Sequence, residues 1–285
     1  MRLGITAFLT DLTMAPADLA RAVEERGFHS FYLPEHTHLP VRADTPPALV
    51  EGVHAEDYRR SLDPFVGLST AASVTERILL GTGVVLAAQH DPIVLAKQIA
   101  TLDHLSGGRV VFGMGFGWNR EEAADHGVEF ATRRDVAREH VLCMQALWSE
   151  DQAEYHGEHV QLDPCWSWPK PVQQPRVTTL IGGGAHPSVF AAIAEYADGW
   201  LPIGGAGLTD AIPRLRRAVE DADRDPEGVS VVPFGTVPTD QKLDHYRRLG
   251  IEEVVLRVPS GKGDEMLAVL DRHAAYLQRF GADGG

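Results

Sequence analysis

The chain has little cysteine and no long hydrophobic run. Its 285 residues include only Cys143 and Cys165, so neither a disulfide framework nor a four-cysteine zinc site can be built within one chain. No stretch reaches the ~18 consecutive apolar residues of a membrane span, and the N-terminus lacks the apolar core of a secretion signal. We therefore expect a cytoplasmic protein that does not enter a membrane.

Basic side chains are also scarce, because 26 Lys and Arg stand against 40 Asp and Glu, for a net charge of −14. This balance argues against a nucleic-acid or anionic-membrane partner. The content of 44% hydrophobic and 23% charged residues is ordinary for a soluble enzyme. Since 285 residues is within the range of one α/β barrel and no shift in composition marks a boundary, we expect a single domain over residues 1–285.

Short apolar runs alternate with amphipathic segments, which is the pattern of repeated βα units around a parallel sheet. Expected strands are residues 3–8, 28–33, 78–86, 110–114, 177–181, 200–203, 229–234 and 253–258. Expected helices are residues 16–26, 62–74, 93–105, 133–148, 187–197, 212–222, 242–249 and 266–280. Residues 153–174 indicate a hairpin insertion, and the irregular residues 37–60 a functional loop such as a lid. The fold predicted is a (β/α)8 TIM barrel with insertions.

In such a barrel the active site lies where the strands end, so the residues that follow each strand are the candidates for chemistry. Glu35 and His36 follow the second expected strand, and Gly182, Gly183, Gly184 and Ala185 follow the fifth. The glycines open onto a helix, whose free amides and dipole make a phosphate site without a lysine. A plain flexible turn is the alternative.

Other candidate site residues also have simpler structural explanations. Gly113, Gly115 and Gly117 lack the spacing of the dinucleotide fingerprint, so by themselves they indicate tight packing of strand against helix more than contact with a ligand. His36 is a candidate acid or base, and its alternative is a loop histidine that caps a backbone group.

Two other features of the sequence are weak candidates for a metal site or a substrate-binding wall. His36 and His38 resemble the metal pairs of barrel hydrolases, but a site of that kind would have its pair after the first strand, with further His and Asp ligands after later strands, and we expect no metal. Trp166 and Trp168 indicate packing under the hairpin or a subunit contact, more than a substrate wall.

Several blocks of sequence together resemble the bacterial luciferase-like family of flavin and deazaflavin oxidoreductases over nearly the whole chain. The matching blocks are residues 27–28, 34–36, 78–84, 91–109, 113–118, 181–184 and 194–200. The resemblance implies an eight-stranded barrel, a homodimer and a ring-shaped cofactor near the third strand. It also implies a non-proline cis peptide at Gly83-Val84 behind the ring.

By the same resemblance, Gly115, Gly117 and Trp118 border the ring, and the loop at Gly182 to Ala185 holds the ribityl phosphate. Residues 82–84 and 117–122 look most like the deazaflavin branch, whose coenzyme F420 (8-hydroxy-5-deazaflavin) passes hydrides. His36 would be the proton donor or acceptor, with Glu35 as its orienter or as a ring contact. The substrate would be a small organic molecule.

Other functions stay open. One is an FMN-dependent monooxygenase that uses oxygen and a reductase partner; another is an inactive cofactor-binding protein; a metal hydrolase is a distant third. The sugar-phosphate dehydrogenases of the family carry a tryptophan soon after the matching histidine, whereas this chain has Thr37 to Pro40 there, so we do not expect a sugar phosphate. The polyglutamate tail of the coenzyme would need cations near the mouth of the barrel. Those that could lie there are Arg42, Arg59, Arg60 and Arg120.

Overall fold

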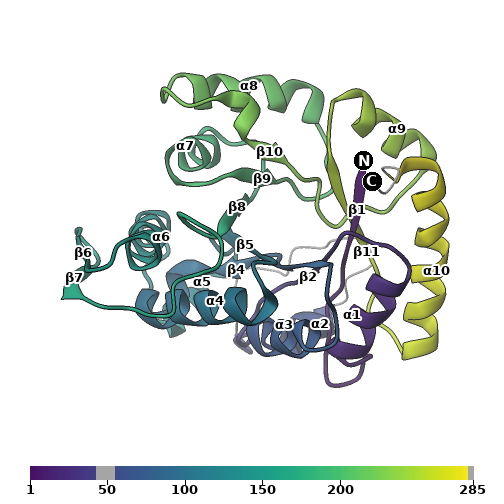
Figure 1. Ribbon diagram of the computed structural model, residues 1–285, viewed down its shortest axis with the longest axis horizontal. Helices are drawn as coiled ribbons and strands as arrows, with labels where there is room; N and C mark the ends of the chain where they lie inside the picture. Colours follow the sequence, from purple (N-terminus) through teal and green to yellow (C-terminus); the bar gives the residue numbers. More distant parts are fainter. Residues whose placement is uncertain (43–54, 282–285) are drawn as a thin grey trace.

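The computed structural model describes residues 1–42 and 55–281. Its main sheet is parallel, with neighbouring strands in the order β11-β1-β2-β3-β5-β8-β9-β10. A parallel bridge from Thr236 to Leu256 brings the segment after β10 against β11, so the sheet forms a nearly closed barrel (Figure 1). The strands are β1 (Arg2–Thr6), β2 (Ser30–Leu33), β3 (Leu79–Thr82), β5 (Val110–Gly115), β8 (Thr178–Gly182), β9 (Gly199–Leu201), β10 (Ser230–Val231) and β11 (Glu253–Arg257). The predicted fold class is confirmed.

Helices surround the barrel (Figure 1). Their starts follow the local sequence: Asp91 caps α4 by accepting hydrogen bonds from the amides of Ile93 and Val94, and Gly107 ends that helix in the left-handed conformation. The helices are α1 (Pro16–Glu25), α2 (Ala55–Arg59), α3 (Pro64–Ala72), α4 (Pro92–Ser106), α5 (Arg120–Asp125), α6 (Arg133–Ser149), α7 (Pro187–Tyr196), α8 (Leu208–Glu220), α9 (Asp240–Arg248) and α10 (Gly263–Phe280).

Three elements differ from the sequence-based expectation. The strand expected at residues 78–86 is interrupted, because β3 ends at Thr82 and the short β4 (Val85–Leu86) pairs only with β5. Helix α5 was not expected, and α2 falls in the segment expected to be irregular. The remainder of the expected loop, residues 43–54, lies outside the described residues.

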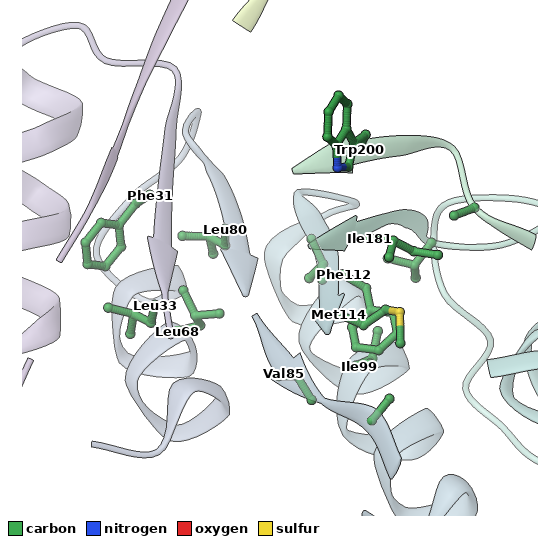
Figure 2. Close-up of a cluster of buried hydrophobic side chains, with 14 of the residues drawn as sticks. Phe31, Leu33, Leu68, Leu80, Val85, Ile99, Phe112, Met114, Ile181 and Trp200 are labelled. Atoms are coloured by element: carbon green, nitrogen blue, oxygen red, sulfur yellow. The ribbon is translucent and has the colours of Figure 1, made fainter. Parts of the chain in front are cut away.

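The main core lies between the sheet and its helices. In Figure 2, Leu80 of β3 lies beside Leu68 of α3, and Phe112 of β5 lies beside Ile99 of α4. These four side chains and Phe31 of β2 are fully buried. A second cluster fills the barrel interior with Tyr32, Val111, Leu180, Leu201, Val232, Phe234 and Val255. Burial of this apolar surface stabilises the barrel, and cavities lie at both ends of the packed interior.

The predicted insertion is present as a hairpin of β6 (Ala153–His156) and β7 (Gln161–Cys165), which projects from the barrel beside α6 (Figure 1). Trp166 and Trp168 are 70% and 60% exposed, so they do not pack under the hairpin as expected. Among the helices of residues 1–42 and 55–281, none combines the length and the apolar character that crossing a membrane requires.

Candidate active site

A cavity of about 400 Å³ lies at the carboxyl ends of the strands. Every site residue predicted from the sequence lines it except Ala185, which is exposed to solvent. The predicted residues in the wall are Glu35, His36, Gly83, Val84, Gly115, Gly117, Trp118, Gly182, Gly183 and Gly184. The loops after β2, β3, β5 and β8 therefore converge on one mouth, as parallel strands require.

The wall at the third strand is built around the Gly83-Val84 peptide bond, which is cis, as the family resemblance implies. A Cβ atom at Gly115 would lie 2.6 Å from Cγ2 of Val84, and one at Gly182 would lie 2.7 Å from Cγ1. Neither distance is compatible with a side chain, so both glycines make room for Val84. A Cβ at Gly83 would lie 2.2 Å from the Phe234 ring. The glycines noted in the sequence thus shape the wall around one valine.

His36 is bound to a carboxylate that the sequence analysis did not identify. Its Nδ1 lies 2.9 Å from Oε2 and 3.1 Å from Oε1 of Glu122, and Glu122 is completely buried. Asn119 caps α5 by accepting hydrogen bonds from the amides of Glu121 and Glu122, which fixes the position of this carboxylate. Because an ionised carboxylate only accepts, Nδ1 carries a proton and Nε2 is the nitrogen left for a ligand.

Glu35 does not orient His36, so that expectation was wrong. Its carboxylate accepts a hydrogen bond from the Leu86 amide and one from Nε2 of His90, both at 2.8 Å. Burial lowers the pKa of His90, but the hydrogen bond and charge of Glu35 outweigh burial and raise that pKa above its usual value. Glu35 therefore fixes the backbone just after the Gly83-Val84 cis peptide, which we call the bulge. Contact of Glu35 with the cofactor ring stays a prediction.

Aromatic rings surround His36. The ring centroid of Tyr58, on α2, lies 5.1 Å from that of His36 and 5.0 Å from that of Phe8. Trp118 lies 5.6 Å from His36 and 5.9 Å from Tyr58. Burial raises the pKa of Tyr58, so its hydroxyl keeps its proton. Tyr58 belongs to a segment without periodicity, and no sequence signal identified it.

The cations of the cavity are not the ones expected. Arg133 and Arg134, in the first turn of α6, and Arg257, at the end of β11, line it. Arg42, Arg59, Arg60 and Arg120 do not: Arg59 pairs with Glu56, Arg60 with Asp11, and Arg120 lies over Phe130. Strand-end position could have identified Arg257.

Arg134 lies on the side of the mouth formed by β5 and α6. Its guanidinium is 4.3 Å from the centroid of the Phe116 ring. One of its terminal nitrogens, Nη1, is buried and has no hydrogen-bond partner among the described residues. A buried guanidinium nitrogen without an acceptor is the donor that an anionic ligand would satisfy.

The glycine loop after β8 is open to this space. Trp200 donates a hydrogen bond from Nε1 to the Gly183 carbonyl at 2.9 Å, which holds the loop against β9. A Cβ at Gly184 would meet nothing within 4 Å. Helix α7 follows, with His186 as its N-cap and Pro187 in the first turn. The loop therefore precedes a helix N-terminus, where anions are stabilised.

The part of the chain that the structure describes brings no three His, Cys, Asp or Glu side chains together as metal ligands. Nδ1 of His36 faces Glu122, and Nε2 of His38 lies 3.0 Å from Asp125. The two histidines that resembled a metal pair thus bind different carboxylates.

The model of one family, described as luciferase-like monooxygenase, matches residues 15–280. The chain belongs to this family. An uncharacterised protein of Mycobacterium tuberculosis is 42% identical over 281 residues, which cover 97% of this chain and 99% of the relative. An F420-dependent glucose-6-phosphate dehydrogenase of Kineococcus radiotolerans is 30% identical over 216 residues, covering 73% of this chain and 59% of the relative.

The fold of the luciferase-like family also appears among solved structures. A monooxygenase from Streptomyces bottropensis superimposes with a TM-score of 0.77 at 20% identity, covering 99% of this chain and 100% of the other. The luciferase-like match and the dehydrogenase relative together support an oxidoreductase.

Proposed function

We propose that this protein is a cytoplasmic oxidoreductase that transfers a hydride between coenzyme F420 and a small organic substrate. The observation that carries the proposal is the buried His36–Glu122 pair, whose histidine lines the same cavity as the Gly83-Val84 cis peptide and the glycine loop. The F420-dependent relative and the residues of the deazaflavin branch support this coenzyme over FMN.

The cavity fits a group with a flat ring and a phosphate. Its volume of about 400 Å³ is within the range of ligand pockets. The loop at Gly182 to Ala185 would hold the phosphate, with the Gly183 amide already donating to the Leu201 carbonyl at 3.4 Å, and Arg134 would supply the Nη1 donor that has no described partner. The ring would lie against Val84, bordered by Gly115, Gly117 and Trp118.

When bound, the deazaflavin supplies or accepts the hydride at the substrate carbon. In the reduction of a carbonyl, the π bond to oxygen breaks as the carbon gains the hydride, and His36 Nε2 donates a proton to that oxygen. In the oxidation of an alcohol, Nε2 accepts the hydroxyl proton. Glu122 holds Nδ1–H in both directions and stabilises the imidazolium. The rings of Tyr58 and Trp118 pack beside the His36 ring, at centroid distances of 5.1 and 5.6 Å.

The alternative on the same barrel is an FMN-dependent monooxygenase that uses oxygen and a reductase partner. The shared fold with the Streptomyces monooxygenase favours it, and the same bulge and glycine loop would hold FMN. Substrate-dependent oxygen uptake with reduced FMN is its signature.

The test is binding and turnover. Purified protein is incubated with oxidised and reduced coenzyme F420 and with FMN, and His36→Ala is compared with wild type. We expect F420 to bind and His36→Ala to lose turnover while it retains the coenzyme. Tight binding of FMN alone would overturn the proposal, and unchanged turnover in His36→Ala would overturn the role of His36.

We also propose that the protein is a homodimer. Large apolar side chains are exposed on α3, α4 and the segment after the hairpin, namely Val66, Ile93, Val94, Leu105, Trp166, Trp168 and Val172. Exposed apolar surface of this kind favours association. Light scattering of the purified protein is expected to give twice the chain mass, and a monomer mass would contradict the proposal.

A further inference from the structure

We propose that Arg257 binds an anionic group of the substrate, so that the substrate is a small molecule with a hydrophobic body and a carboxylate or similar anion at one end. This inference rests on the proposed function, because it concerns the part of the same cavity that a cofactor ring would leave open. Arg257 supports it by its position, by the way its guanidinium is held, and by the residues between it and His36.

Arg257 lies across the barrel from the other cations of the cavity. Counted around the sheet from β1, β5 is the fourth strand and β11 is the eighth, so the ends of these strands lie on opposite sides of the mouth. Arg133 and Arg134 lie beside the loop after β5, near the expected phosphate site. Arg257, at the end of β11, is too far round the barrel to share that phosphate.

The guanidinium of Arg257 is nearly buried and lies against Gly235. Arg257 is only 9% exposed, and a Cβ at Gly235 would lie 2.2 Å from its Nη2. Gly235 has a φ of +65°, a conformation that L side chains rarely adopt, so the chain keeps a glycine where the guanidinium lies. A guanidinium has five N–H donors and can bind a ligand anion beside any protein acceptor it already has.

The charge of the cavity differs from that of the chain. The chain carries a net charge of −14, yet the described residues of the cavity wall include three arginines and one acid, Glu35. The Glu35 carboxylate already accepts hydrogen bonds from the Leu86 amide and His90. The wall therefore attracts anions, at the phosphate side and again at Arg257.

The wall between Arg257 and His36 is apolar. Strand β1 lies between β11 and β2, and Thr6 of β1 pairs with both Arg257 and Tyr32, so the backbones at Arg257 and Tyr32 are about 10 Å apart. His36 follows Tyr32 by four residues, toward the mouth. Phe8, which follows β1, and Tyr58 pack against each other there. Such a wall offers few partners for the hydroxyls of a sugar, but it suits an aromatic or aliphatic body with its anion at Arg257 and its reacting carbon beside His36.

The experiment compares an anion with its neutral counterpart. Protein loaded with oxidised coenzyme F420 is titrated with trans-cinnamate and with cinnamamide, which share shape and differ in charge. The variants are Arg257→Met, Arg257→Lys and, as a matched loss of one surface charge, Arg217→Gln, whose side chain is 73% exposed on α8. Circular dichroism checks that each variant is folded.

We expect wild type and Arg217→Gln to bind cinnamate at least tenfold more tightly than cinnamamide. Arg257→Met should reduce this preference below twofold without changing the affinity for cinnamamide, and Arg257→Lys should retain part of it. Equal binding of the two probes by wild type, or a preference that survives in Arg257→Met, would overturn the inference.

The coenzyme and the anion site at Arg257 are tested by different measurements. If coenzyme F420 does not bind, the proposed function fails, and the same probes are titrated into the protein without coenzyme. A preference for cinnamate that depends on Arg257 would still support the anion site. If the coenzyme binds but the probes show no preference, only the anion site is overturned.

Discussion

The two ends of the barrel both contain a cavity, and the cavities are similar in size. The one at the carboxyl ends of the strands measures about 400 Å³ and the one at the amino ends about 350 Å³. Both are lined by titratable side chains, among them His36 and Arg257 at the carboxyl end and His29 and Glu253 at the amino end. Neither volume nor the presence of charge distinguishes an active site here.

The difference is in what the polar groups already bind. At the amino end, Ser30 donates a hydrogen bond to Glu253 at 2.6 Å, and Arg2 pairs with Glu252. Burial raises the pKa of Glu253 and lowers that of His29, so both groups tend to be neutral. At the carboxyl end, Glu122 holds Nδ1 of His36 and leaves Nε2, and Arg134 has a buried donor without a described partner. Each end leaves one buried nitrogen without a described hydrogen-bond partner, His29 Nε2 at the amino end and Arg134 Nη1 at the carboxyl end. Only at the carboxyl end is that nitrogen part of a guanidinium that can donate to an anion, beside a histidine held by a buried carboxylate.

Removal of one carboxylate at each end should have the largest effect on the difference between the two ends. We expect Glu122→Gln to lower kcat at least about 100-fold, because the amide can no longer stabilise the His36 imidazolium. Coenzyme affinity should stay within twofold, and the pH dependence of kcat should change. Turnover is measured from F420 absorbance, and affinity from its fluorescence.

Glu253→Gln is the matched control at the amino end, expected to keep kcat within twofold. If the two variants lost activity equally, the distinction between the ends would be wrong. If Glu122→Gln kept both kcat and its pH profile, Glu122 would have no role through His36.

The second test concerns the space that two glycines leave for Val84. Gly182→Ala should weaken coenzyme binding at least about tenfold, because the new Cβ would lie 2.7 Å from Val84 and push the wall toward the ring. Gly228→Ala, at the amino end, meets only Asp225 at 4.0 Å and should change nothing. Equal coenzyme affinities in fluorescence titrations of the two variants would contradict this account of the wall.

A smaller effect is expected for Arg134. Arg134→Met removes a charged donor from the phosphate side, so coenzyme affinity should fall about fivefold and depend less steeply on salt. Titrations at two salt concentrations measure this. An unchanged affinity at low salt would remove Arg134 from the site.

The smallest effect is on stability at the amino end. Burial raises the folded-state pKa of Glu253, although Ser30 and Arg2 oppose the shift. A raised acid favours folding while it is protonated and loses that contribution as the pH rises above its unfolded-state value. Glu253→Gln should therefore raise Tm by about 2 °C near pH 8 and by nothing near pH 4. A gain that is equal at both pH values would contradict this reasoning.

The barrel was predictable because each βα unit can be recognised from its own stretch of sequence, as an apolar run followed by an amphipathic helix. The interruption after β3 was not, since residues 78–86 read as one continuous strand, and only the resemblance indicated the bulge at Gly83-Val84. Glu122 was missed for a physical reason: it lies 86 residues from His36 in the sequence and on a six-residue helix too short to show periodicity.

Glu35 shows the opposite error. Its position next to His36 suggested that the two side chains act together, but adjacent residues of an extended segment point in different directions. The Glu35 carboxylate instead contacts the Leu86 amide and His90. Sequence neighbours were a poor guide to partners, whereas strand-end position was a good guide to the cavity wall.

The cofactor that the protein prefers decides whether the carboxyl-end cavity is the site of a hydride transfer. The purified protein is titrated with oxidised coenzyme F420 and with FMN under identical conditions. The two dissociation constants show which ligand the bulge and the glycine loop bind more tightly. We expect F420 to bind at least tenfold more tightly than FMN and to be reduced or oxidised with a substrate in a His36-dependent reaction. Tight FMN binding with no detectable F420 binding would contradict the central claim.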